Sequence, residues 1–209
     1  QPCDHIESID IAGINYLSFT VGQLLSENEL IWLSNLSFIF ALYQQSGDSA
    51  ESMLHPVALT PHSYVDPKIS MLLKYGGKTN EIFTRLMINV GLVTSDYGLD
   101  DSIQMLDPVA GKGTTLFEGA VRGFDVTGIE MERKMVHETT VFFKRFLEQD
   151  KYKHTLSKHD MYSSSTGNEA FIQLFEYARD KQDFKSETTR KHLAIIAGNA
   201  IHSRRYFKA

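Results

Sequence analysis

The chain has 209 residues, of which 42% are hydrophobic, so it is long enough for one large domain or for one domain with a small appendage. Its net charge of −5 excludes a generally basic nucleic-acid-binding protein but leaves room for a local basic patch. The single cysteine, Cys3, excludes an intrachain disulfide and favours the cytoplasm, and the chain shows neither a signal-peptide pattern nor an apolar run of about 18 residues.

The first part of the chain, residues 1–66, predicts a small α+β appendage. Residues 6–21 are rich in β-branched and aromatic residues that alternate loosely with polar ones, which indicates strands. Ser26 is followed three residues later by Glu29, which is the capping-box pattern of a helix start. A short helix is therefore expected from residue 28 to about residue 36.

Two further strands are expected in this appendage, at residues 37–43 and at residues 53–59, the second broken at Pro56. No catalytic constellation is visible in the segment. Its scattered histidines are more often structural or surface residues than ligands; they are His5, His55 and His62. Only its position suggests that the appendage could help to hold a substrate.

A helical run after Pro67 is interrupted around Tyr75 by the Gly-Gly pair that follows. Thr79 is a suitable N-cap for a second helix, in which Ile82, Leu86 and Val90 share one face. By itself the pattern describes an N-capped amphipathic helix.

Residues 102–132 contain the most informative pattern in the chain. A short apolar run ends at Asp107, a glycine loop follows, and a helix is expected over residues 116–122. A second apolar run, residues 124–129, ends at Glu130. The order is therefore strand, glycine loop, helix, strand and acid.

The glycine loop, DPVAGKGTT, carries the candidate chemistry. Gly111 and Gly113 would let backbone N–H groups approach a ligand closely, and Glu130 could accept hydrogen bonds from ribose hydroxyls. The loop is not GxGxxG, and it is not a Walker A loop because Lys112 is not followed by Ser or Thr. The alternative is a βαβ unit in which the glycines only turn the chain.

This stretch resembles motif I of the class I S-adenosylmethionine-dependent methyltransferases, in particular the branch that methylates base amines in RNA (tRNA guanosine) and DNA. The resemblance implies a Rossmann-like α/β sheet over residues 67–209, with residues 1–66 as an appended α+β domain. It implies that the loop backbone holds the amino-acid part of S-adenosylmethionine and that the acid binds its ribose. The cofactor-binding residues so implied are Asp107, Pro108, Ala110, Gly111, Gly113, Thr114, Glu130 and Met131.

Two further segments extend the resemblance. The segment YGGKT, at residues 75–79, is similar to motif X of the tRNA guanosine amino-methyltransferases, which implies that Thr79 lies where the chain wraps the methionine end of the cofactor. After a core-facing helix over residues 132–149, a third strand is expected from Tyr152, ending near Asp160 and Met161. In the family an acid at that place accepts a hydrogen bond from the adenine amino group, and an apolar neighbour packs on the ring.

The chain then departs from the family. The catalytic Asp/Asn-Pro-Pro-Tyr/Phe motif after a fourth strand is absent, so the catalytic residues are unknown. Residues 169–181 are expected to be helical and residues 193–197 to form a strand, followed by a basic tail. Either the enzyme is degenerate or truncated, or a mobile catalytic segment is missing near residues 162–167.

The expected function is S-adenosylmethionine-dependent methylation of a base amine, with RNA, most often tRNA, as the partner and DNA as another possible acceptor. No metal is expected, since no His/Cys cluster has zinc spacing. One alternative is a non-catalytic S-adenosylmethionine- or nucleotide-binding module, such as a partner subunit without the catalytic loop. Another is a dinucleotide oxidoreductase. The oligomeric state is left open.

Overall fold

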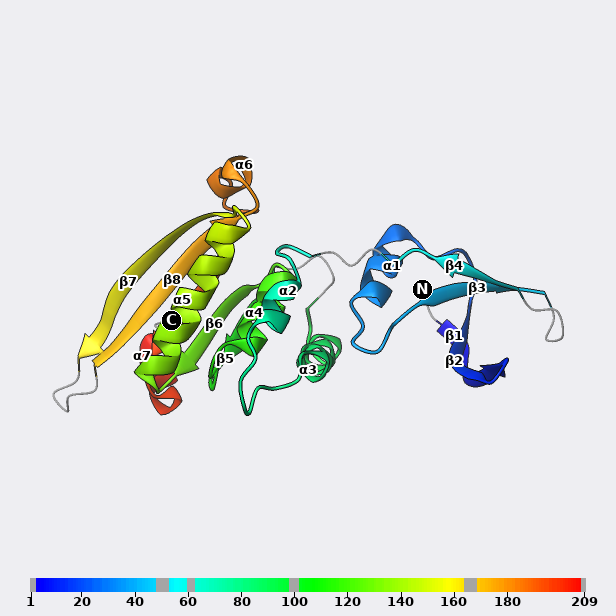
Figure 1. The fold of residues 1–209 in the computed structure, drawn as a ribbon, viewed down its shortest axis with the longest axis horizontal. Helices are drawn as coiled ribbons and strands as arrows, with labels where there is room; N and C mark the ends of the chain where they lie inside the picture. The colour runs from blue at the N-terminus through cyan, green and yellow to red at the C-terminus, as the bar shows by residue number, and fades with distance from the viewer. Residues whose placement is uncertain (1–2, 48–52, 60–62, 98–101, 164–168, 208–209) are drawn as a thin grey trace. The chain divides into compact units, whose positions relative to one another are not determined.

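The computed structural model describes residues 3–47, 53–59, 63–97, 102–163 and 169–207. The chain divides into two compact units, Gln1–His62 and Ser63–Ala209 (Figure 1). The division lies slightly before the expected boundary at residue 66, because Tyr64 and Val65 are buried in the core of the second unit.

The first unit consists of two separate two-stranded ladders and one helix. Its elements are β1 (Cys3–Ile11), β2 (Ile14–Val21), α1 (Glu27–Ser34), β3 (Leu42–Ser46) and β4 (Met53–Val57). β1 pairs with β2 and β3 pairs with β4, both antiparallel. The predicted capping box is confirmed: the Ser26 hydroxyl accepts the Glu29 N–H, and a Glu29 carboxylate oxygen accepts the Ser26 N–H at 2.8 Å.

Two local expectations in this unit are wrong. The strand predicted over residues 37–43 begins only at Leu42. Pro56 does not break its strand but pairs with Tyr43. Each strand of a two-stranded ladder has an open edge. A proline has no N–H group, and at an open edge no hydrogen bond of the ladder is lost.

The second unit is a mixed α/β structure built on one five-stranded sheet. Its helices are α2 (Lys68–Leu72), α3 (Glu81–Val93), α4 (Thr114–Val121), α5 (Arg133–Gln149), α6 (Lys181–Lys185), the 3₁₀ turn η1 (Ala200–His202) and α7 (Ser203–Tyr206). Its strands are β5 (Gln104–Asp107), β6 (Asp125–Glu130), β7 (Lys153–Ser163), β8 (Glu169–Ala178) and β9 (Lys191–Ala197). The predicted α/β class is confirmed, and the strand, helix and strand around the glycine loop lie within about a residue or two of their expected bounds.

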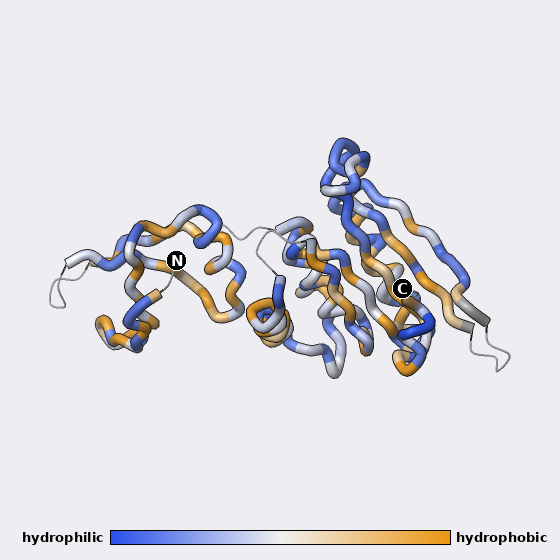
Figure 2. Tube along the Cα trace, turned by 180° about the vertical axis from the view of Figure 1, so that it is seen from behind, coloured by the Kyte–Doolittle hydropathy of each residue, from blue (hydrophilic) through white to orange (hydrophobic). Residues whose placement is uncertain are grey.

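The strand order of this sheet is β5-β6-β9-β8-β7. β5, β6 and β9 are mutually parallel, whereas β8 runs antiparallel to both of its neighbours, β9 and β7. The sheet therefore has a parallel half and a long β7–β8 hairpin at its other edge (Figure 1). Apolar residues run along its central strands (Figure 2).

The core lies between the sheet and the helices α4 and α5, which cover the same face. Phe143 of α5 is fully buried and contacts the rings of Phe117, Phe175 and Tyr177 at centroid distances of 5.8, 5.0 and 5.3 Å. The stripe predicted for the long helix is confirmed, since Val136, Thr140, Phe143 and Leu147 are all buried. This packing holds α4, and with it the glycine loop, against the sheet.

The prediction of a helix over residues 169–181 is wrong, because most of this segment is strand β8. Its aromatic residues fit a period of two as well as one of 3.6. Phe175 and Tyr177 face the core, while Glu176 between them lies on the other face, where it contacts Thr155. Hairpin pairing with β7 decided between the two periods.

Helix α3 also differs from its prediction. Its N-cap is Asn80 and not Thr79, and the Asn80 side chain accepts the N–H groups of residues 82 and 83. The expected apolar face is exposed: Ile82, Leu86 and Val90 have exposed fractions of 58, 43 and 54%. The buried residues of the helix are Thr84 and Ile88. Within the described ranges, no helix combines the length and apolarity needed to cross a bilayer.

Candidate cofactor site

The glycine loop is shaped by two residues with positive φ. Gly111 has φ of 53° and Gly113 has φ of 84°, a region that side chains strongly disfavour. A Cβ atom on Gly113 would lie 2.9 Å from Cγ2 of Thr139, whereas a Cβ on Gly111 would meet no atom within 4 Å. Gly113 is therefore required by packing as well as by backbone conformation, and Gly111 faces open space that a ligand can reach.

Backbone hydrogen bonds fasten the loop to the second parallel strand. The Ala110 N–H donates to the carbonyl of Ile129 at 2.9 Å, and the Gly113 N–H donates to the carbonyl of Ala110 at 2.8 Å. A Cβ on Gly128 would lie 2.7 Å from the Ala110 side chain, so a glycine in β6 lets the loop approach the strand. The loop is thus held directly over the ends of β5 and β6.

The predicted acid and the predicted loop are in direct contact. One carboxylate oxygen of Glu130, Oε2, accepts the Gly111 N–H at 3.0 Å. The other, Oε1, accepts the Glu132 N–H at 2.7 Å. Each carboxylate oxygen has a second lone pair, so Glu130 is oriented by the protein and can still accept hydrogen bonds from a ligand hydroxyl.

The other expected residues surround this contact. Asp107 ends β5 and accepts the Val109 N–H at 2.9 Å, which turns the chain at Pro108. Thr114 begins α4 and is buried, with its hydroxyl 3.4 Å from that of Tyr75. Met131 follows Glu130 and is exposed.

Lys112 supports the loop from its outer side. Its Nζ lies 2.8 Å from Oε2 of Glu138 on α5 and 4.9 Å from the ring centroid of Tyr75. The hydrogen bond to Glu138 raises the pKa of Lys112, and the same bond lowers the pKa of Glu138. Tyr75 is therefore the residue of the segment 75–79 that contacts the loop, while the predicted ligand Thr79 is an exposed residue just before the Asn80 cap.

The resemblance implied that Asp160 contacts the same cofactor as Glu130, but the structure places the two acids apart in the sheet. Asp160 lies in β7 and pairs with Phe171, which pairs with Ala197, which pairs with Glu130. Three strand spacings of about 4.8 Å put the two acids roughly 14 Å apart. Asp160 and its neighbour Met161 consequently lie on the outer hairpin, away from the loop.

The third parallel strand is β9, and its end takes the position expected of Asp160. The Gly198 N–H donates to the carbonyl of Glu130 at 3.0 Å, so Gly198 and Asn199 lie directly beside the acid. The Asn199 side chain accepts the Ile201 N–H at 3.0 Å, which starts the η1 turn. The sequence did hold a signal for this position, since an apolar strand followed by Gly-Asn mirrors the strand that ends at Glu130.

The segment expected to hold a catalytic loop, residues 162–167, connects two strands of a hairpin. β7 and β8 are paired antiparallel as far as Ser163 and Glu169. The segment therefore does not follow a parallel strand. Most of it, from residue 164 onward, lies outside the described residues.

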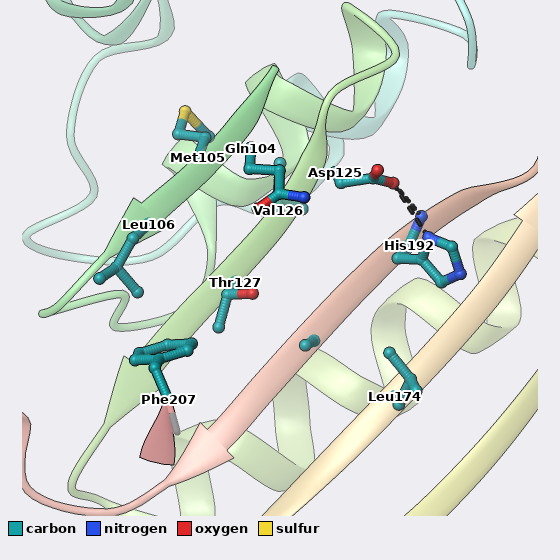
Figure 3. Close-up of a pocket in the computed structure, with 10 residues that line it drawn as sticks. Gln104, Met105, Leu106, Asp125, Val126, Thr127, Leu174, His192 and Phe207 are labelled. Carbon is teal, nitrogen blue, oxygen red and sulfur yellow. Dashed lines mark hydrogen bonds and ion pairs between the residues drawn. The ribbon is translucent and has the colours of Figure 1, made fainter. Parts of the chain in front are cut away.

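A cavity of about 450 Å³ lies on the sheet face turned away from α4 and α5 (Figure 3). Leu106, Thr127, Leu174 and Phe207 line it, and the pair of Asp125 and His192 lies at one end (Figure 3). It contains none of the predicted cofactor residues. Phe207, the residue that follows α7, lines this hollow, which is separate from the candidate site.

No group of His, Cys, Asp and Glu side chains suited to a metal ion is present in the part of the chain that the structure describes. Comparison with protein-family models, with curated proteins and with solved structures found no match for this chain. The function must therefore be argued from the geometry of the site.

Proposed function

We propose that residues 63–209 bind S-adenosylmethionine and form the cofactor-binding part of a methyltransferase. The observation that carries the proposal is the 3.0 Å hydrogen bond between the Gly111 N–H and Glu130. It joins the glycine loop and the acid, which the sequence separates by 19 positions, into one surface at the ends of parallel strands. Ligands of open parallel sheets bind at such carboxyl ends.

The cofactor would lie across the ends of β5, β6 and β9. The open side of Gly111 and the loop backbone receive the amino-acid part, and Asp107 lies at the start of that loop. Glu130 accepts hydrogen bonds from the ribose hydroxyls. Gly198 and Asn199, which lie next to Glu130, replace Asp160 as the residues beside adenine.

The chemistry is transfer of the sulfonium methyl group to an amine. The lone pair of the amine nitrogen attacks the methyl carbon in line with the C–S bond, and the bonding pair returns to sulfur. The products are a methylamine, S-adenosylhomocysteine and one proton. Because the sulfonium is already activated, the protein contributes mainly proximity and orientation.

A base amine of RNA, such as tRNA, is the proposed acceptor. The family resemblance motivates it, and the charge distribution indicates which unit would contact phosphates. All 21 Lys and Arg residues lie in residues 63–209, whereas seven Asp and Glu residues and no Lys or Arg lie in residues 1–62. A phosphate backbone requires cations, so RNA would contact the second unit and not the first.

A binding module without catalysis is the second candidate. Two observations favour it: the Asp/Asn-Pro-Pro-aromatic motif is absent from the sequence, and within the described ranges no strand pairs with the outer edge of β5. In this case the same site binds S-adenosylmethionine or a nucleotide, and no methyl group is transferred.

Calorimetric titration of the full chain with S-adenosylmethionine, S-adenosylhomocysteine, NAD and ATP tests the proposal. We expect saturable binding of the first two. Binding of NAD alone would instead support an oxidoreductase and would refute both candidates above. Transfer of a labelled methyl group to total tRNA then separates the enzyme from the binding module.

A further inference from the structure

A partly buried polar network joins helix α3 to helix α4. Glu118 of α4 is 1% exposed, and its Oε2 lies 2.9 Å from Nε of Arg85 on α3. One turn further along both helices, Nη2 of Arg122 donates to Oδ1 of Asn89 at 2.6 Å. The spacing of four residues on each helix makes these contacts two successive rungs between the same two faces.

This network leaves polar groups buried at a cost in free energy. The Oε1 atom of Glu118 is buried and has no hydrogen-bond partner among the described residues, and burial lowers the pKa of Arg122 to about 10. A buried ion pair often stabilises a protein no more than apolar residues of similar volume.

The rotation of α3 follows from these rungs. Arg85 and Asn89 face α4, while Ile82, Leu86 and Val90 are left exposed. An amphipathic helix that packed only to bury area would turn its apolar stripe inward. The polar contacts therefore select one rotation of α3, which is the usual attested benefit of buried polar groups.

That rotation determines where the segment before α3 lies. The segment 75–79, here called the strap, ends at the Asn80 cap of α3. Its first residue, Tyr75, contacts the start of α4 through the hydroxyl of Thr114 at 3.4 Å and through the Nζ of Lys112. The strap is thus held at one end by the glycine loop and at the other by a helix whose rotation depends on Glu118.

We propose that Glu118 and Arg85 are positioning residues for the cofactor: their contact holds the strap over the glycine loop, where it covers the methionine end of S-adenosylmethionine. The assignment rests on the proposed function. Neither residue touches the reacting atoms. Their effect on the cofactor is exerted through the rotation of α3 and the position of Tyr75.

The test uses Glu118→Gln in the full chain, which keeps the side-chain shape and removes the charge. Arg85→Met removes the other partner of the same contact, which is the more exposed of the two. It replaces the first variant if Glu118→Gln folds poorly. Leu147→Ala is the stability control, because Leu147 is a buried residue of α5 and takes no part in the contacts of Arg85 with Glu118 or of Arg122 with Asn89. Affinities for S-adenosylmethionine and for adenosine, which lacks the methionine part, are measured with exchange of the backbone amides of residues 75–93.

We expect the affinity of Glu118→Gln and Arg85→Met for S-adenosylmethionine to fall roughly 3- to 30-fold, with the affinity for adenosine unchanged and faster amide exchange in the strap. Leu147→Ala should leave the ratio of the two affinities at the wild-type value. Equal losses for both ligands, or an unchanged ratio with unchanged exchange, would overturn the assignment. If the wild type binds no S-adenosylmethionine, the proposed function fails. Separately, unchanged amide exchange of the strap in the variants would show that the contact between Glu118 and Arg85 does not position the strap.

Discussion

Both units of the chain contain apolar residues (Figure 2), but the two units bury them to different extents. No described residue of the first unit is buried, and Phe40 and Leu24 are 99 and 80% exposed. The second unit buries Phe143, Phe175 and Leu193 completely. An isolated two-stranded ladder has no second layer to cover its faces, whereas a five-stranded sheet with two helices on one face encloses a core.

Charge separates the units as clearly as burial does. Seven acidic residues and no Lys or Arg give the first unit a net charge of −7, while 21 basic and 19 acidic residues give the second unit +2. The chain's net charge of −5 therefore conceals an acidic unit and a nearly balanced one. The comparison teaches that the stable scaffold and every predicted cofactor residue belong to the second unit.

The largest difference is expected for matched aromatic truncations. Phe143→Ala removes a ring that contacts three other aromatic rings in the core and should lower the free energy of unfolding by about 3–5 kcal/mol. Phe40→Ala removes a fully exposed ring and should change it by less than about 0.5 kcal/mol. Urea denaturation followed by circular dichroism measures both; similar losses would mean that the first unit has a core of its own.

The next largest effect concerns ligand binding in the second unit. Glu130→Ala removes the acceptor of the Gly111 N–H and a bond to the ribose, and should weaken S-adenosylmethionine binding by about 1.5–3 kcal/mol. Asp160→Ala is the matched control and should leave the affinity unchanged, because Asp160 lies three strands away. Calorimetric titration measures both variants. If Asp160→Ala lost as much affinity as Glu130→Ala, Asp160 would contact the cofactor, and the strand order that separates the two acids would not hold in the bound protein.

A smaller effect is expected at the helix caps, where the two units are built alike. Ser26→Ala should destabilise α1 by about 1 kcal/mol, because it removes the acceptor of the Glu29 N–H and one side of the capping box. Trp32, the single tryptophan, lies in α1, so its fluorescence reports the loss during denaturation. Asn28→Ala, inside the same helix, is the control. Unfolding of the first unit that is insensitive to Ser26→Ala would indicate that α1 does not contribute to its stability.

The smallest effect is a pH dependence confined to the second unit. The hydrogen bond to Asp125, with Nδ1 and Oδ1 3.1 Å apart, raises the pKa of His192. A raised folded-state pKa adds stability below the unfolded value of about 6.5, and this stability is lost as the pH rises through the folded value. Both side chains are partly exposed, so the contribution should be only a few tenths of a kcal/mol. Denaturation at pH 6 and pH 8 should differ more in the wild type than in His192→Gln, and an equal difference would contradict the pairing.

Local pattern predicted several elements of each unit, including the candidate cofactor loop. The capping box at Ser26, the glycine loop and the stripe of the long helix α5 depend on residues within a few positions of one another. The nearness of the loop and Glu130 follows from the strand-helix-strand order, since two parallel strands joined by a helix bring their carboxyl ends together, and the structure adds the hydrogen bond between them.

Prediction failed where the outcome depends on distant partners. Residues 169–178 have apolar positions that fit a helix or a strand, and pairing with β7 made them a strand. The third strand of the site was expected to begin at Tyr152 and end near Asp160, whereas that segment is β7 of the outer hairpin and the third parallel strand is β9. Asp160 was therefore expected where Gly198 and Asn199 lie.

The sequence by itself determined the elements of the site: a glycine loop, an acid at the end of the next strand, and the long helix α5 with its buried stripe. The tertiary structure decided which strand lies third, which residues end beside Glu130, and which way α3 turns toward Glu118. Local elements follow from backbone conformation and periodicity. Strand order and helix rotation depend on long-range pairing and packing. These involve residues from the whole chain, so no single segment of the sequence determines them.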